Sequence, residues 1–260
     1  MTLAPEWIRH ISRRGLEYTL AGAGPVIVLV HGWCLSRSIW MYLERDLVES
    51  GHSVIALDLA GYGGSAAVLP RRTAADHAGD VIDLLDELEV DGAVLVGFAF
   101  GAGVILSAHD YDRVGALVSV SVPSAAAAPY GRMRGSIVKD WPRFAARSAQ
   151  AILSDSASPE TKSWIGRIFE ATNIRSALAG LDVLEVLEPT ELPKRWNVPA
   201  TFAHGSADPM VPAAVSQRCA ELFGGEYREF ESSSHLVVID QKEALLNLVQ
   251  RVVKSQTRQD

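Results

Sequence analysis

The rest of the chain is arranged around one segment, Ala93-Val94-Leu95-Val96-Gly97-Phe98-Ala99-Phe100-Gly101-Ala102-Gly103. An apolar run typical of a buried strand ends in the pattern Gly-x-Ala-x-Gly, and small residues that suit a helix follow. Such a sharp turn from strand to helix is typical of a nucleophile elbow, whose central residue points into a site. Glycines on both sides allow the close backbone approach that the turn requires. Here the central residue is Ala99, and its methyl group cannot act as a nucleophile.

Length and composition favour one large α/β domain. The chain has 260 residues, and its formal net charge of −7 gives no electrostatic support for a nucleic-acid partner. No apolar run reaches the roughly 18 residues of a membrane helix, and the first residues lack the basic and apolar segments of a secretory signal. Cys34 and Cys219 give neither a metal-binding spacing nor a disulfide framework. We therefore expect a cytoplasmic protein that binds neither nucleic acid nor a membrane.

Strand-like and helix-like segments alternate along most of the chain. The apolar, β-branched runs that we expect to form buried strands are 26–30, 54–57, 93–98, 116–122, 200–203 and 227–230. This alternation predicts crossover connections and a mostly parallel central sheet with helices on both faces. The alternation stops after Pro123, and three helical segments follow, at 137–153, 159–172 and 174–187. We predict a core domain of residues 1–123 and 191–260, with a helical lid insertion of residues 124–190.

Two polar residues follow later strands, at positions where this architecture places active sites. Asp208 comes soon after the strand at 200–203, and His235 comes after the strand at 227–230. Acyl transfer by an enzyme nucleophile needs a base, an acid that orients the base, and donors for the oxyanion. The chain order Ala99, Asp208, His235 matches the order nucleophile, acid, histidine. We predict a hydrogen bond of roughly 2.6–3.2 Å between Asp208 and His235, with the other ring nitrogen facing Ala99.

Five segments resemble the α/β-hydrolase family in sequence and in order. They are His31-Gly32-Trp33, Asp58-Leu59-Ala60-Gly61-Tyr62-Gly63-Gly64-Ser65, the elbow, the Gly205-x-x-Asp208 loop and the His235 loop. The resemblance covers the whole chain except the lid and is strongest to the small serine esterases that include cofactor-free haloperoxidases. It implies an oxyanion hole formed by the backbone N–H groups of Trp33 and Phe100, with Asp208 orienting His235 as the general base. It implies no metal and no organic cofactor.

Ala99 departs from the family pattern and leaves three explanations open. In the leading one, the natural residue is serine, and the chain is an inert variant of a hydrolase that cleaves a carboxylic ester or a lactone. In the second, a natural alanine marks a non-catalytic ligand-binding protein. In the third, the His235–Asp208 pair acts without a nucleophile, as in the cofactor-independent dioxygenases of this fold. The segment Gly32-Trp33-Cys34 resembles the oxyanion loop of those enzymes.

An aspartate nucleophile fits the sequence less well. The dehalogenases of the family usually have tryptophan after the nucleophile, where this chain has Phe100. The epoxide hydrolases usually supply lid tyrosines, and this lid has only Tyr130.

The side chains expected around the site are largely apolar. The substrate-binding residues that we expect are Trp33, Cys34, Phe98, Phe100, Trp141, Phe144 and Trp164. They favour a small-molecule substrate with an apolar acyl, alkyl or aromatic group, bound by a monomer or a homodimer. His204 lies at an apolar strand end, where we expect a hydrogen-bonded, partly buried structural histidine.

Overall fold

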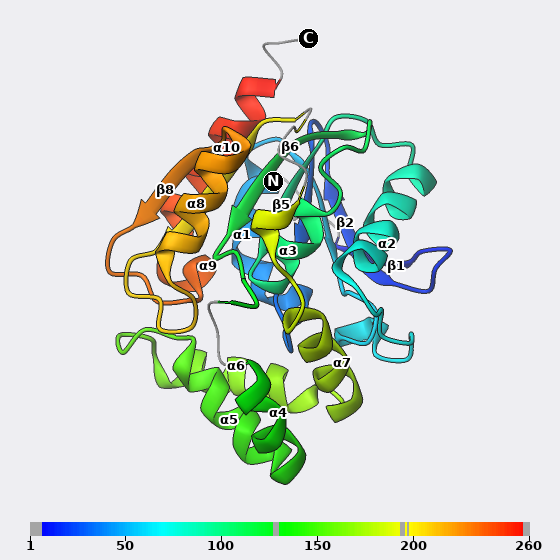
Figure 1. Ribbon diagram of the computed structural model, residues 1–260. Helices are drawn as coiled ribbons and strands as arrows, with labels where there is room; N and C mark the ends of the chain where they lie inside the picture. The colour runs from blue at the N-terminus through cyan, green and yellow to red at the C-terminus, as the bar shows by residue number, and fades with distance from the viewer. Residues whose placement is uncertain (1–6, 127–129, 193–195, 197, 257–260) are drawn as a thin grey trace.

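One sheet of eight strands organises the computed structural model, which describes residues 7–126, 130–192, 196 and 198–256 (Figure 1). In this described part, the strand order across the sheet is β1-β2-β4-β3-β5-β6-β7-β8. The strands are β1 (Ile8–Ile11), β2 (Glu17–Gly22), β3 (Val26–Val30), β4 (Ser53–Leu57), β5 (Ala93–Phe98), β6 (Val114–Val120), β7 (Ala200–Gly205) and β8 (Glu226–Phe230). Among the described strands, the pairs β1–β2 and β2–β4 are antiparallel and the other five pairs are parallel, so the expected mostly parallel α/β sheet is confirmed.

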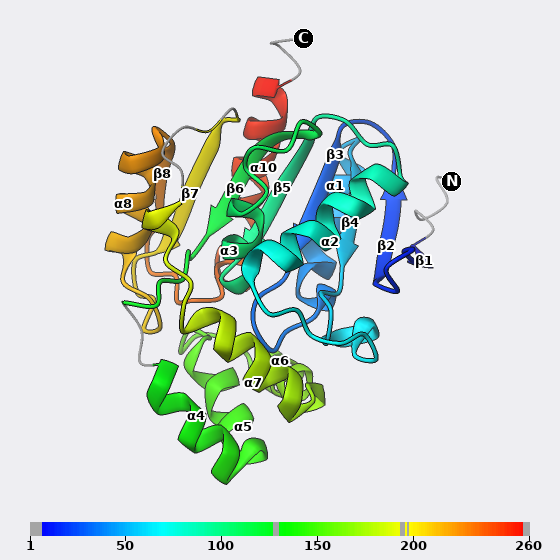
Figure 2. The same ribbon diagram turned by 45° about the vertical axis from the view of Figure 1, so that its right-hand side comes forward.

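Helices cover both faces of the sheet (Figure 2). The central strands are therefore continuous apolar runs, without the alternation of apolar and polar residues seen in strands that have one face in water. Helix α1 (Met41–Glu49), which follows the short 3₁₀ helix Arg37–Trp40, packs with α10 (Lys242–Gln256) on one face. The other face carries α2 (Ala74–Glu87), α3 (Phe100–Leu106) and α8 (Ala213–Phe223). Every residue of β5 is buried between these layers.

Among the described residues, four α-helices lie between β6 and β7 in sequence and gather beyond the carboxyl ends of the parallel strands (Figures 1 and 2). They are α4 (Tyr130–Lys139), α5 (Trp141–Ala151), α6 (Pro159–Ala171) and α7 (Ile174–Leu184), which we call the helical insertion. The prediction of a single helix at 137–153 is wrong, because one helix ends at Lys139 and another begins after Asp140. The Asp140 carboxylate accepts a hydrogen bond from the Arg143 backbone N–H at 3.1 Å and caps a new helix, in which Pro142 occupies the first turn.

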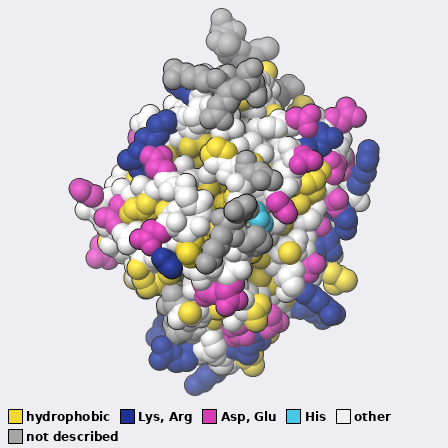
Figure 3. Space-filling view, turned by 45° about the horizontal axis from the view of Figure 1, so that its top comes forward, with side chains coloured by type: hydrophobic (Ala, Val, Ile, Leu, Met, Phe, Trp, Pro, Cys, Tyr) yellow, Lys and Arg dark blue, Asp and Glu magenta, His cyan; other side chains and the backbone are white. Residues whose placement is uncertain are grey.

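The outer surface mixes side-chain types. Acidic and basic side chains are interspersed with apolar ones on the face seen in Figure 3. Within the described part of the chain, no helix combines the length and apolarity needed to cross a membrane.

Candidate active site

The turn between β5 and α3 holds Ala99 in a backbone conformation that alanine rarely adopts. Its φ is 48° and its ψ is −111°, and its N–H donates to the Val120 carbonyl oxygen at 2.8 Å. A Cβ atom at Gly97 would lie 2.4 Å from the Gly101 oxygen, and one at Gly101 would lie 2.3 Å from the Val30 oxygen. The turn therefore needs glycine on both sides, and it fixes the direction of the Ala99 methyl group.

The loops after β7 and β8 bring Asp208 and His235 together. The His235 Nδ1 atom lies 2.7 Å from the Asp208 Oδ2 atom, within the expected range, and both side chains are buried. The Asp208 Oδ1 atom accepts hydrogen bonds from the backbone N–H groups of Met210 and Val211, at 2.7 and 3.1 Å. Burial acts to raise the pKa of Asp208. The charge of His235, with hydrogen bonds from His204, His235 and Met210, overcomes this effect and holds the pKa of the carboxyl well below its usual range.

Backbone contacts fasten these two loops to each other. The Ala207 N–H donates to the Ser233 carbonyl oxygen at 2.9 Å, and the Ser206 N–H donates to the Phe230 oxygen at 3.0 Å. A Cβ atom at Gly205 would lie 2.3 Å from the Ser234 oxygen, so only glycine permits this approach. The Asp208–His235 contact therefore rests on a rigid pair of loops.

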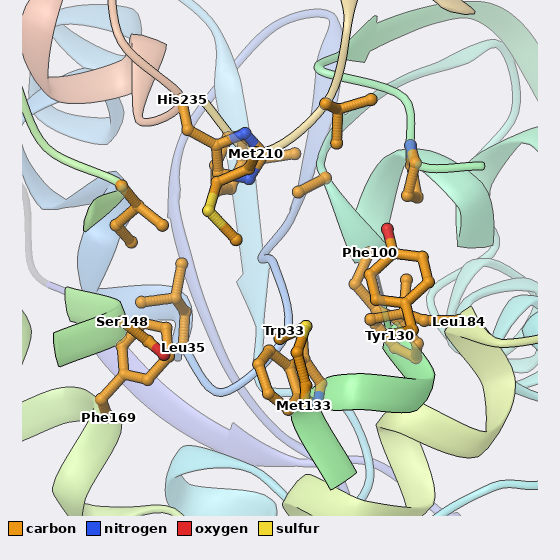
Figure 4. A pocket seen from close by; sticks show the side chains of 15 residues that line it. Trp33, Leu35, Phe100, Tyr130, Met133, Ser148, Phe169, Leu184, Met210 and His235 are labelled. Carbon is orange, nitrogen blue, oxygen red and sulfur yellow. The ribbon is translucent and has the colours of Figure 1, made fainter. Parts of the chain in front are cut away.

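A cavity of about 60 Å³ lies between these loops, the elbow and the helical insertion (Figure 4). Its walls are mostly apolar, and the residues that line it are Trp33, Leu35, Phe98, Ala99, Phe100, Pro123, Tyr130, Met133, Ser148, Ile152, Phe169, Leu184, Met210, Val211 and His235. Ala99 and His235 thus line the same cavity, and the His235 Nε2 atom has no hydrogen-bond partner among the described residues. No cluster of metal-ligating side chains is present in the described part of the chain.

Two residues that line this cavity have backbone N–H groups that the described part of the fold does not use. Those of Trp33 and Phe100 donate to no other described residue, although both residues line the cavity. The Trp33 ring is fixed from behind, because its indole N–H donates to the Ala177 carbonyl oxygen at 2.9 Å. Trp33 and Phe100 therefore meet one requirement for oxyanion donors, an unused N–H group on a residue that lines the cavity, and the oxyanion hole itself stays a prediction.

Three of the seven expected substrate-binding residues line the cavity, and they are Trp33, Phe98 and Phe100. The Phe98 ring lies 5.0 Å from the His235 ring, centroid to centroid. Cys34 is fully buried and does not line the cavity, so it forms part of the packing behind the Trp33 loop. Burial raises the pKa of the Cys34 thiol well above its usual value, which keeps the thiol neutral.

The three aromatic residues expected from the insertion lie outside this cavity. Trp141 donates its indole N–H to the Thr172 carbonyl oxygen at 3.1 Å and stacks on Phe144. Phe144 lines a neighbouring surface groove, and Trp164 packs edge-on against Tyr42. Their helical spacing indicated an apolar helix face correctly. It could not indicate which neighbouring element that face would meet.

Residues 124–190 instead supply cavity residues that lie outside the expected substrate-binding set. They are Tyr130, Met133, Ser148, Ile152, Phe169 and Leu184. Tyr130 and Ser148 carry the hydroxyl groups, and they lie on opposite sides of the cavity in Figure 4. The Tyr130 hydroxyl makes no hydrogen bond to any described residue. Burial, reinforced by the charge of Asp208, raises the pKa of Tyr130 well above its usual value, so the phenol remains a donor.

An acid–histidine pair and a strained turn at the carboxyl ends of a mostly parallel sheet are the arrangement of the α/β-hydrolase class of proteins. Residues 27–248 match the model of the alpha/beta hydrolase family, so this chain belongs to that family.

Comparison with individual proteins agrees with this membership. Pimeloyl-[acyl-carrier protein] methyl ester esterase of Vibrio atlanticus is 29% identical over 252 residues, which are 88% of this chain and 94% of the relative. The AB hydrolase superfamily protein YisY of Bacillus subtilis is 25% identical over 248 residues, 88% of this chain and 91% of the relative. The crystal structure of bromoperoxidase from Bacillus anthracis superposes with a TM-score of 0.87 at 20% identity, covering 95% of this chain and all of that one. That likeness shows the fold.

Proposed function

We propose that this site is built to hydrolyse a small carboxylic ester or lactone, and that Ala99 occupies the position of a serine nucleophile. The observation that carries the proposal is the backbone of Ala99, which keeps a strained positive φ beneath His235 although a methyl group gains nothing from it. As it stands, the chain lacks an attacking oxygen and is inactive as an acyl-transfer enzyme.

The surrounding groups supply the remaining steps when residue 99 is serine. His235 takes the hydroxyl proton as the serine oxygen attacks the substrate carbonyl, and Asp208 stabilises the resulting imidazolium. The free N–H groups of Trp33 and Phe100 bind the oxyanion. His235 then protonates the leaving alcohol. Finally it takes a proton from the water that attacks the acyl-enzyme and gives that proton to the serine oxygen as the acyl–oxygen bond breaks, which releases the acid and restores the serine.

The cavity supports a short, apolar acyl or alkyl group as the part of the substrate that enters. Its volume of about 60 Å³ is far below the roughly 300–1,000 Å³ of pockets for drug-sized ligands. Larger substrates would need the helical insertion to move, so we assign this insertion the role of a lid. The Vibrio atlanticus relative, an esterase of a methyl ester, supports the ester class.

A second candidate is base catalysis by the histidine–aspartate pair without a serine. The contact between Asp208 and His235 is complete with alanine at position 99, and the second nitrogen of His235 faces the apolar cavity. In this alternative, His235 removes a proton from a bound substrate that then reacts with dioxygen. A chain that binds ligands without turnover is the third possibility. Neither of these forms a covalent acyl-enzyme.

Covalent labelling separates these functions. We expect the Ala99→Ser protein to gain the mass of one phosphonyl group when it is incubated with a small alkyl fluorophosphonate, with the label on residue 99. The unsubstituted protein and Ala99→Ser/His235→Ala should remain unlabelled. If Ala99→Ser also remains unlabelled, the acyl-transfer proposal is wrong, and oxygen uptake with hydroxylated heteroaromatic substrates then tests the second candidate.

A further inference from the structure

A second histidine contacts the carboxylate that orients His235. His204 lies near the carboxyl end of β7 and is fully buried, more deeply than the partial burial expected from sequence. Its Nε2 atom is 3.2 Å from the Asp208 Oδ2 atom and 2.9 Å from the Val211 carbonyl oxygen. Its Nδ1 atom is 2.8 Å from the Ser216 Oγ atom. Asp208 Oδ2 therefore has a histidine on each side.

These contacts fix the position of the proton on His204. The Val211 carbonyl oxygen can only accept a hydrogen bond, and the Asp208 carboxylate is ionised, so the Nε2 atom between them must carry the hydrogen. The Ser216 hydroxyl can then donate to Nδ1, which completes the hydrogen bonds of a neutral ring. The Nε2–H group is thus shared between two acceptors, one of which is the Oδ2 atom that also accepts from His235.

We propose that His204 is a positioning residue for the Asp208–His235 pair, because its Nε2–H holds the shared Oδ2 atom in place and takes up part of its negative charge. The two N–H groups of Met210 and Val211 fix the other carboxylate oxygen. His204 therefore completes the set of four donors around Asp208, and it acts on His235 only through that carboxylate.

The proposal predicts the sign of a measurable change in the protonation of His235. A carboxylate oxygen that gives part of its charge to His204 stabilises the protonated form of His235 less strongly. Removing the His204 donor should therefore make His235 easier to protonate. Loss of loop structure would have the opposite effect, since His235 would lose its contact with Asp208. Within the described part of the chain, Tyr130 is a further titratable group on which the Asp208 charge acts, and it stays neutral.

The test uses the chain with Ala99 in place, so it does not depend on the proposed hydrolase activity. Nitrogen NMR of histidine-labelled protein should first show His204 with its proton on Nε2. In His204→Phe, the pH midpoint at which the His235 ring signals titrate should rise by about one unit, the size expected when a hydrogen bond to a charged group is lost. His204→Gln keeps an N–H donor and should leave the midpoint within about 0.3 units of the unsubstituted protein. Ser216→Ala should also leave the His235 midpoint unchanged, because the His204 Nε2–H group keeps both of its acceptors.

Two results would overturn the inference. A neutral His204 ring with its proton on Nδ1 alone in the unsubstituted protein would mean that Nε2 cannot donate to Asp208, and this result needs no variant to fold. A folded His204→Phe protein whose His235 midpoint is unchanged or lowered would assign His204 a packing role alone.

Discussion

At the scale of single residues, Ala99 combines a costly backbone conformation with a side chain that has no chemistry. Non-glycine residues in such sparsely populated regions cost roughly 1–3 kcal/mol. The surrounding glycines and the hydrogen bond to Val120 hold the chain there regardless of the side chain. The strain therefore belongs to the elbow, and a hydroxyl at position 99 would use it to face His235.

We expect Ala99→Gly to stabilise the protein. Glycine adopts a positive φ without the clash of a Cβ atom, and this gain should exceed its greater freedom in the unfolded chain by about 1 kcal/mol. Ala102, three residues on in α3, is the matched control. Ala102→Gly should destabilise by about 1 kcal/mol, because its backbone is helical. Urea unfolding measures both values, and equal losses in the two variants would show that Ala99 is not strained.

The free hydroxyl of Tyr130 gives a second prediction at this scale. We expect Tyr130→Phe to change the free energy of unfolding by less than about 0.5 kcal/mol, because no protein hydrogen bond is lost. Tyr62 is the control, since its buried hydroxyl donates to the Ser176 carbonyl oxygen at 3.1 Å. Tyr62→Phe should cost about 1–2 kcal/mol. A loss of that size in Tyr130→Phe would mean that its hydroxyl is used by the fold and is not available to a ligand.

At the scale of elements, the elbow depends on how closely α3 approaches β3. Gly101→Ala would place a methyl group 2.3 Å from the Val30 carbonyl oxygen, and neither backbone can withdraw. We expect a loss of about 3 kcal/mol or failure to fold. Gly166 in α6 has no atom within 4 Å of an added Cβ, so Gly166→Ala should gain about 0.5–1 kcal/mol. Thermal unfolding of both proteins checks the contrast, and a stable Gly101→Ala protein would contradict this description of the turn.

The elements of the core could be predicted from the sequence better than those of the insertion. Strands such as β3 and β5 are short apolar runs between polar turns, and burial on both faces gives them a composition that few helices share. The break between α4 and α5 was missed because Asp140 and Pro142 continue an apparently helical spacing. A capping side chain that begins a new helix overrode that periodicity.

At the scale of the whole molecule, the functional pair could be predicted and the cavity wall could not. Asp208 and His235 follow strands whose carboxyl ends must lie at one edge of a parallel sheet, so their loops had to be neighbours. The cavity face of the insertion depends on how four helices dock on that edge. Trp141 and Tyr130 are both aromatic residues of the insertion, and nothing local distinguishes the one that reaches the cavity.

The pH dependence of stability should carry the signature of buried Glu44. Burial, opposed by Arg37 and reinforced by Asp58, raises the pKa of Glu44 from 4.5 to about 7. The folded protein therefore binds a proton that the unfolded chain releases in this range. Its contribution to stability is complete below pH 4.5 and is lost as the pH rises through about 7, by at most about 3 kcal/mol.

Glu44→Gln should remove this loss. Denaturant unfolding of both proteins between pH 4.5 and 8 gives the difference between their free energies of unfolding at each pH. The contributions of all other titratable groups cancel in this difference. Glu49→Gln, on the exposed face of the same helix, should keep the slope of the unsubstituted protein. If Glu44→Gln keeps it too, Glu44 is ionised in the folded state.

The central claim is that everything required for ester hydrolysis except the attacking oxygen is in place, and turnover by Ala99→Ser tests it most directly. Loss of the nucleophile in comparable sites costs on the order of 10⁶ in turnover, so we predict that Ala99→Ser hydrolyses nitrophenyl acetate and butyrate at least roughly a thousandfold faster than the unsubstituted protein. Ala99→Ser/His235→Ala should lose that gain, because the serine would have no base. Equal background rates for all three proteins on these esters and on simple lactones would contradict the claim.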